Sequence, residues 1–79
     1  MNFRNWIIIK YFGKDNRFGD LANDIKTSED FPDTSNKTLK EEKEIITTYL
    51  FRKNACGACM DTFFDAFKRY ARWVKQRDL

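Results

Sequence analysis

Four segments of the chain carry apolar residues at helical spacing, and polar stretches separate them. In the first segment, residues 2–12, Phe3, Trp6 and Ile7 stand three and four positions apart, as on one face of a helix. The three consecutive isoleucines of this segment would also suit a strand. We prefer a helix, which Gly13 would end because glycine accepts the backbone conformation that follows a helix.

A second apolar series predicts a shorter helix in an otherwise polar region. This series follows the i, i+3, i+4, i+7 pattern of an amphipathic helix and consists of Phe18, Leu21, Ala22 and Ile25. The chain then turns at Pro32, its only proline, which favours an extended backbone at Phe31. We expect the Phe31 ring to fold back onto the core and fix this loop.

A capping box predicts where the third helix begins. Thr38 and Glu41 stand three positions apart, so each side chain can accept a hydrogen bond from the backbone N–H of the other residue. The first turn, which contains Glu42, is expected to be exposed, and the second half of the helix to be buried. The side chains expected to face inward are Leu39, Ile45, Ile46, Tyr49 and Leu50.

The fourth segment is the longest and predicts a helix with a buried face of about five turns, capped by Asn54. Acidic side chains come early in it and basic side chains late, as the helix dipole prefers. Asp65 precedes Arg69 by four positions, which suits an ion pair along the helix. Its apolar series consists of Cys56, Cys59, Met60, Phe63, Phe67, Tyr70, Ala71 and Val74.

Together these segments predict one all-α domain over residues 1–79, a small bundle of four to five helices with the long C-terminal helix as its spine. A chain of 79 residues lies near the lower end of what folds alone, but its eight phenylalanines and two tryptophans supply large rings for a core. The residues expected in this core are Trp6, Ile7, Leu21, Ile25, Phe31, Ile46, Leu50, Phe63, Phe67 and Tyr70.

The charged side chains are distributed unevenly. Residues 13–36 carry three basic and six acidic side chains, whereas residues 68–77 carry five basic and no acidic ones. A basic helix face would bind nucleic acid or an acidic protein surface, although basic side chains also simply solvate a helix end. The opposite charges of the two regions would also permit head-to-tail self-association. The candidate binding residues are Lys68, Arg69, Arg72, Trp73 and Lys75.

Cys56 and Cys59 form a C-x-x-C, a spacing found in metal sites and in redox centres. Two cysteines without histidine cannot supply the four ligands of a structural zinc site. A redox dithiol at a helix N-terminus is the stronger alternative, but a thioredoxin arrangement needs further strands after the helix. Because both residues continue the apolar series of the last helix, we expect them to pack in the core. Gly57 disfavours a helix here, which keeps the dithiol redox alternative open.

Enzymatic activity is not expected from this sequence. Histidine, the commonest general base, is absent, and neither a glycine-rich phosphate loop nor a pair of carboxylates in an apolar setting is evident. We expect no cofactor, no metal ion and no small-molecule substrate. No apolar run approaches the ~20 residues of a membrane span, no targeting segment is visible, and two cysteines suit a reducing compartment, so we expect a cytoplasmic protein.

Several short stretches resemble the YozE family, short bacterial and phage-associated proteins with a fold like the sterile alpha motif. They are FRNW at 3–6, DLANDI at 20–25, DFP at 30–32, EIITTYL at 44–50 and FDAFKRY at 64–70. The chain departs from the family where Phe67 replaces an expected tryptophan and where KTLKEEKE lengthens a connection; CGAC is not part of the family pattern. The resemblance implies a sterile-alpha-like helical fold.

The expected function is therefore a non-enzymatic module that binds macromolecules, with nucleic acid held by the basic C-terminal helix. The alternatives are a protein–protein interaction module, including a phage-encoded inhibitor of a host protein, and a dithiol redox protein that uses Cys56 and Cys59. The link from a sterile-alpha-like fold to a binding function rests on similarity of fold alone.

Overall fold

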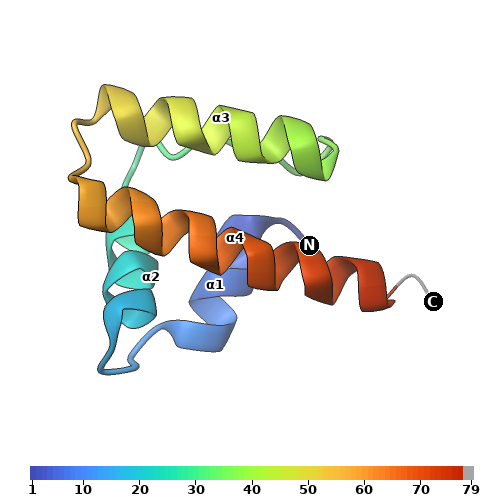
Figure 1. The fold of residues 1–79 in the computed structure, drawn as a ribbon, viewed down its shortest axis with the longest axis horizontal. Helices are drawn as coiled ribbons and strands as arrows, with labels where there is room; N and C mark the ends of the chain where they lie inside the picture. The colour runs from blue at the N-terminus through green and yellow to red at the C-terminus, as the bar shows by residue number, and fades with distance from the viewer. Residues whose placement is uncertain (78–79) are drawn as a thin grey trace.

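The structure, a computed structural model, describes residues 1–77, and these form four helices without a strand. The helices are α1 (Phe3–Tyr11), α2 (Arg17–Thr27), α3 (Leu39–Arg52) and α4 (Gly57–Arg77). Figure 1 shows α4 running through the middle of the molecule, with α3 on one side and with α1 and α2 on the other. The predicted all-α fold with a long C-terminal helix is confirmed. Within the described residues, no helix is long and apolar enough to cross a membrane.

Side-chain caps set the starts of α1 and α3. The Asn2 side chain accepts a hydrogen bond from the N–H of Asn5 and caps α1, which confirms a helix over a strand for this segment. The predicted capping box of α3 is present, with both hydrogen bonds between Thr38 and Glu41 formed at 3.2 and 3.0 Å. These bonds satisfy backbone N–H groups that a helix start leaves without partners.

The start of α4 differs from the prediction. Asn54 does not cap this helix but adopts a left-handed backbone conformation, with φ of 59°, in the turn that follows α3. Asparagine tolerates this conformation better than most residues, which explains its place in the turn. The first backbone hydrogen bond of α4 runs from the N–H of Met60 to the carbonyl of Cys56, so the helix begins two residues later than expected.

Aromatic rings fill the centre of the bundle. Phe3 is 0 % exposed, and its ring centroid lies 5.3 Å from that of Phe67, 5.4 Å from Phe63 and 5.6 Å from Tyr70. Burial and the nearby Glu42 carboxylate raise the pKa of Tyr70 to about 12, so its hydroxyl stays neutral and donates to the carbonyl of Met1. These contacts join α1 to the middle of α4.

Most of the predicted core is confirmed. Its buried members are Trp6, Ile7, Leu21, Ile25, Ile46, Phe63, Phe67 and Tyr70. Phe31 and Leu50 are half-buried and pack against the edge of this core. The Phe31 ring lies edge-on to Tyr49 with centroids 5.2 Å apart, so the loop before α3 is fixed against the second half of that helix.

The prediction that Glu42 lies in an exposed turn is wrong, because this side chain is 2 % exposed. Its Oε2 accepts hydrogen bonds from the N–H of Phe3 at 2.8 Å and from the hydroxyl of Thr34 at 2.5 Å. Glu42 stands four residues before the buried Ile46 and therefore shares its helix face. A carboxylate of α3 thus holds the N-terminus of α1, where the helix dipole favours negative charge.

Gly19 allows the turn before α2 to approach that helix closely. A side chain at this position would place its Cβ 2.0 Å from the carbonyl oxygen of Lys14. No other residue fits here without a backbone shift, so Gly19 is required for this close packing.

Candidate functional site

A pocket of about 330 Å³ lies between the end of α1 and the C-terminal half of α4. We call it the basic pocket. Three of its lining residues are cationic, and among the described residues no carboxylate lines it. The lining residues are Lys10, Tyr11, Arg69, Arg72, Trp73 and Gln76.

Two of the cations are held in place by aromatic neighbours. The guanidinium of Arg69 donates a hydrogen bond to the hydroxyl of Tyr11 at 3.2 Å and lies 4.6 Å from the ring centroid of Phe18. The ammonium of Lys10 lies 5.5 Å from the ring of Trp6. Such cation–π contacts orient a cation without neutralising its charge, so both groups keep their positive charge for an anion.

Trp73 forms a wall of the basic pocket and is half-buried. Its ring stacks on Tyr70 with centroids 6.3 Å apart, and the guanidinium of Arg77 lies 4.9 Å from its centroid. The indole is therefore fixed between the aromatic core and the basic end of α4.

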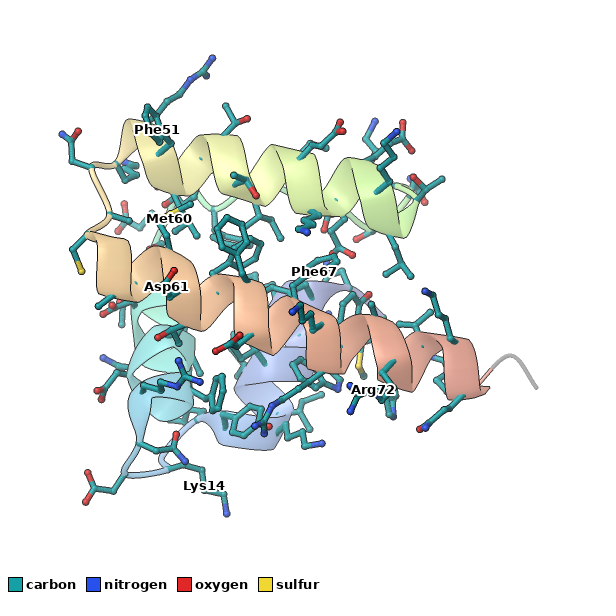
Figure 2. All side chains as sticks on the ribbon, in the orientation of Figure 1. Lys14, Phe51, Met60, Asp61, Phe67 and Arg72 are labelled. Carbon is teal, nitrogen blue, oxygen red and sulfur yellow. The ribbon has the colours of Figure 1, made fainter. Side chains whose placement is uncertain are left out.

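Three of the five predicted binding residues meet in the basic pocket: Arg69, Arg72 and Trp73. The other two, Lys68 and Lys75, are exposed on α4 but do not line it. Figure 2 shows Arg72 on the C-terminal half of α4.

The sequence prediction missed Lys10, Tyr11 and Gln76, which complete the basic pocket. Gln76 follows Arg72 by four positions, so helical spacing alone would have found it. Lys10 and Tyr11 come from another helix, and their position depends on how α1 packs on α4. The one signal in the sequence was Lys10 itself, a basic residue in the last turn of α1 that could have been considered as a binding residue.

The expected ion pair between Asp65 and Arg69 is not formed, because Asp65 pairs with Arg17 of α2 at 2.7 Å. This bond connects α2 to α4 and leaves the Arg69 guanidinium with Tyr11 and Phe18. A second ion pair joins Lys53 and Asp30, and hydrogen bonds from Lys53 and then Tyr49 lower the pKa of Asp30. Neither pair involves a charged residue of the basic pocket.

Acidic side chains gather at the other end of the molecule. Asp20 and Asp24 are exposed on α2 and line a hollow of about 200 Å³ against the start of α4. Figure 1 shows α2 beside the first turns of α4, whereas the basic end of α4 projects from the opposite side of the molecule. Arg17 also lines this hollow and pairs with Asp65, so the two aspartates stand beside one cation.

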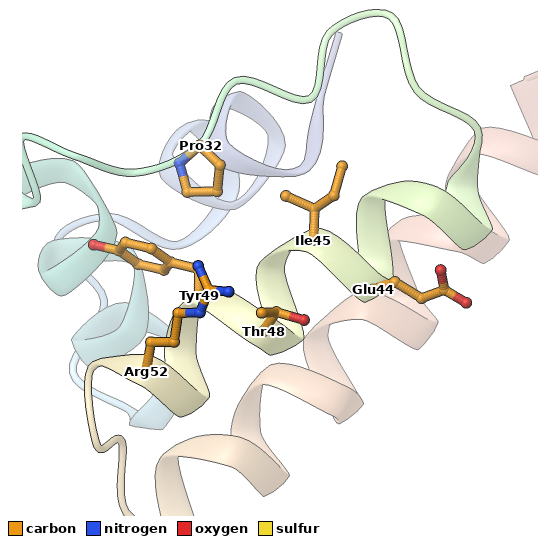
Figure 3. A pocket seen from close by; sticks show the side chains of 6 residues that line it. All are labelled: Pro32, Glu44, Ile45, Thr48, Tyr49 and Arg52. Atoms are coloured by element: carbon orange, nitrogen blue, oxygen red, sulfur yellow. The ribbon is translucent and has the colours of Figure 1, made fainter.

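The largely apolar surface around Tyr49 forms another pocket, of about 390 Å³, between α3 and the loop at Pro32. Figure 3 shows Ile45, Thr48 and Tyr49 along one side of α3, with Pro32 across from them. Glu44 and Arg52 place opposite charges at its margins. The arrangement offers an apolar surface without converging ionic groups.

The prediction that Cys56 packs in the core is wrong. Cys56 is exposed and precedes the first residue of α4, so it cannot continue the buried series of that helix. Cys59 is half-buried. The two sulfur atoms lie 3.2 Å apart, and the Cys59 N–H donates to the Cys56 sulfur at 3.4 Å.

Comparison with known proteins identifies the family. A family model described as the YozE SAM-like fold matches residues 2–72. The chain belongs to the YozE family. No curated protein and no solved structure matches the chain.

For a YozE-family protein, the observed fold is the expected one, and its departures from the family pattern have clear positions. Phe67, where a tryptophan was expected, is 4 % exposed and packs on Phe3 and Tyr70. The YozE match covers Arg69 and Arg72 but ends before Trp73. Part of the basic pocket therefore lies beyond the matched region.

Proposed function

We propose that this YozE-family protein is a binding module that holds nucleic acid at the basic pocket. The observation that carries this proposal is the convergence of Lys10, Arg69 and Arg72 from two helices, with no carboxylate among the described lining residues. Phosphate contacts by lysine and arginine supply most of the affinity in non-specific nucleic-acid binding. Two cysteines in a small chain suit a reducing compartment, so we propose that this binding occurs in the cytoplasm.

Exposed lysines extend the basic pocket along α4. Lys68 and Lys75 stand on either side of Arg72 in the helical sequence and are exposed. A nucleic-acid backbone seated in the pocket would reach them along the helix, because these positions share one helix face. Binding of this kind depends on phosphate charge more than on base sequence.

Replacing Lys10 and Arg72 together by glutamine is expected to weaken nucleic-acid binding by about tenfold or more and to reduce the slope of log K against log salt by about two. The measurement is fluorescence anisotropy with labelled duplex and single-stranded oligonucleotides over a series of salt concentrations. The matched control replaces Lys40 and Arg52, which are exposed on α3 and change the net charge equally. Equal binding by the two double variants would show that net charge, and not the basic pocket, holds the nucleic acid.

Head-to-tail self-association is a second candidate function, favoured by the position of α2, which carries Asp20 and Asp24, away from the basic end of α4 (Figure 1). The acidic hollow with Asp20 and Asp24 on one copy would meet the basic pocket of the next, a heterologous contact that can repeat. We expect the mass measured by light scattering to rise with protein concentration at low salt. Replacing both aspartates by asparagine should remove this rise without weakening oligonucleotide binding. A monomer at every concentration would exclude this function.

A further inference from the structure

We propose that Cys56 and Cys59 are a redox-active dithiol that exchanges with low-molecular-weight disulfides and closes into an intrachain disulfide at the start of α4. The proposal is independent of nucleic-acid binding, because this pair lies at the end of α4 opposite to the basic pocket. It rests on the separation of the sulfur atoms, on their different exposure and on the position of Cys56 as the helix cap.

The sulfur atoms are placed for closure. They lie 3.2 Å apart in the reduced protein, so a disulfide needs no long-range movement of the chain. Gly57 lies between them in sequence, and the space where its side chain would stand is empty within 4 Å. The backbone can therefore adjust locally when the covalent bond forms.

Their exposure separates the roles of the two thiols. Cys56 is exposed and can be reached by a disulfide in solution. Cys59 is half-buried and lines both the acidic hollow beside Asp24 and a pocket of about 390 Å³ next to Leu21 and Lys53. Attack from solvent is thus directed to Cys56, with Cys59 behind it as the resolving thiol.

Cys56 also occupies the position of an N-cap. Its carbonyl accepts the first helical hydrogen bond, and its sulfur accepts the N–H of Cys59 three residues later. The side-chain and backbone hydrogen bonds from Cys59 lower the pKa of Cys56, whereas the pKa of Cys59 is raised by the same partner and by burial. The exposed thiol is therefore the one that forms the nucleophilic thiolate more readily.

The reaction consists of two exchanges. The Cys56 thiolate attacks one sulfur of glutathione disulfide, which forms a mixed disulfide and releases one glutathione thiolate. Cys59 loses its proton and attacks the Cys56 sulfur, which releases the second glutathione. The protein loses two protons and two electrons, and one glutathione disulfide becomes two glutathione molecules.

A metal-ion role and a packing role fit the same residues less well. Within residues 1–77, no group of three potential metal ligands includes this pair, and a structural zinc site requires four. Packing does not explain why Cys56 is exposed. A dithiol uses both the short separation of the sulfurs and the exposure of one of them.

The test treats the reduced full chain with glutathione disulfide, stops the reaction with acid and measures intact mass. We expect the wild-type chain to lose two hydrogen atoms and to remain monomeric. Cys59→Ser should stop at a stable glutathione adduct on Cys56, and Cys56→Ser should react about tenfold more slowly than Cys59→Ser. Serine is a preferred cap residue, so Cys56→Ser should remain folded, which far-UV circular dichroism can verify.

Three results would overturn the proposal. They are equal reaction rates for the two single variants, wild-type chains that carry glutathione on both cysteines without closing, and disulfide-linked dimers as the main product. The double variant with serine at both positions is the control and should not change in mass. Oligonucleotide binding by the oxidised chain should equal that of the reduced chain, so a failure of either proposal leaves the other testable.

Discussion

Replacement of Phe3 by alanine is expected to lower the free energy of unfolding by about 3–5 kcal/mol. The Phe3 ring is fully buried and contacts Phe63, Phe67 and Tyr70 within 5.6 Å between centroids. The substitution removes these contacts and leaves a cavity where α1 meets α4. Domains of this size have total stabilities of roughly 4–12 kcal/mol, so the variant should be close to unfolding. Urea denaturation followed by circular dichroism measures the loss.

Phe51 provides a matched control, since the same substitution there removes the same atoms from an exposed site. Its side chain is 75 % exposed on α3, on the side away from α4 (Figure 2). Phe51→Ala should change the stability by no more than about 0.5 kcal/mol. Phe3→Leu, which keeps an apolar side chain, should cost less than Phe3→Ala and remain measurable if the alanine variant does not fold. Equal losses at positions 3 and 51 would contradict the observed core.

Replacement of Glu42 by alanine is expected to lower the free energy of unfolding by about 3 kcal/mol or more. Its carboxylate accepts hydrogen bonds from the Phe3 N–H and from the Thr34 hydroxyl, and the substitution leaves both buried donors without this acceptor. Thr34 is itself 2 % exposed, so water cannot easily take the place of the carboxylate. Chemical denaturation measures the change, with Glu44→Ala on the exposed side of α3 as the control.

Glu42→Gln separates the hydrogen bonds from the charge. The amide oxygen can still accept from both donors, but the negative charge at the start of α1 is lost, and neutral hydrogen bonds are weaker than charge-assisted ones. The loss of unfolding free energy in Glu42→Gln should therefore be larger than in Glu44→Ala and smaller than in Glu42→Ala. A glutamine variant as unstable as the alanine variant would show that charge, and not acceptance of the two hydrogen bonds, sets the stability.

The parts of the fold that depend on short-range patterns were predictable from the sequence. The capping box of Thr38 and Glu41 fixed the start of α3, and apolar spacing identified the buried faces of α2 and α4. Even the ambiguous isoleucine run proved helical, because its first member, Ile7, follows the helical period together with Phe3 and Trp6. Each of these features is set by residues within a few positions of one another.

The sequence prediction failed where a role depends on a distant partner or on the limit of a helix. Glu42 was expected in solvent because the sequence does not show that the N-terminus of α1 approaches it. Cys56 was assigned to the buried series because its spacing continues that series. The helix begins only at the next residue, Gly57, so Cys56 lies outside it and is exposed. For the basic pocket, α4 was predictable as a source of cations, whereas the contribution of Lys10 depends on the packing of α1.

The contact of Phe3 with α4 has a consequence during synthesis of the chain. The aromatic partners of this ring lie at positions 63, 67 and 70, about sixty residues downstream. The nascent chain therefore carries the face of α1 that packs on α4 without this partner until most of α4 has left the ribosome, although α2 can already pack on α1. Pausing of translation within the codons of α4 would therefore prolong the exposure of that face to chaperones and to aggregation, because the most recently added residues are still inside the ribosome.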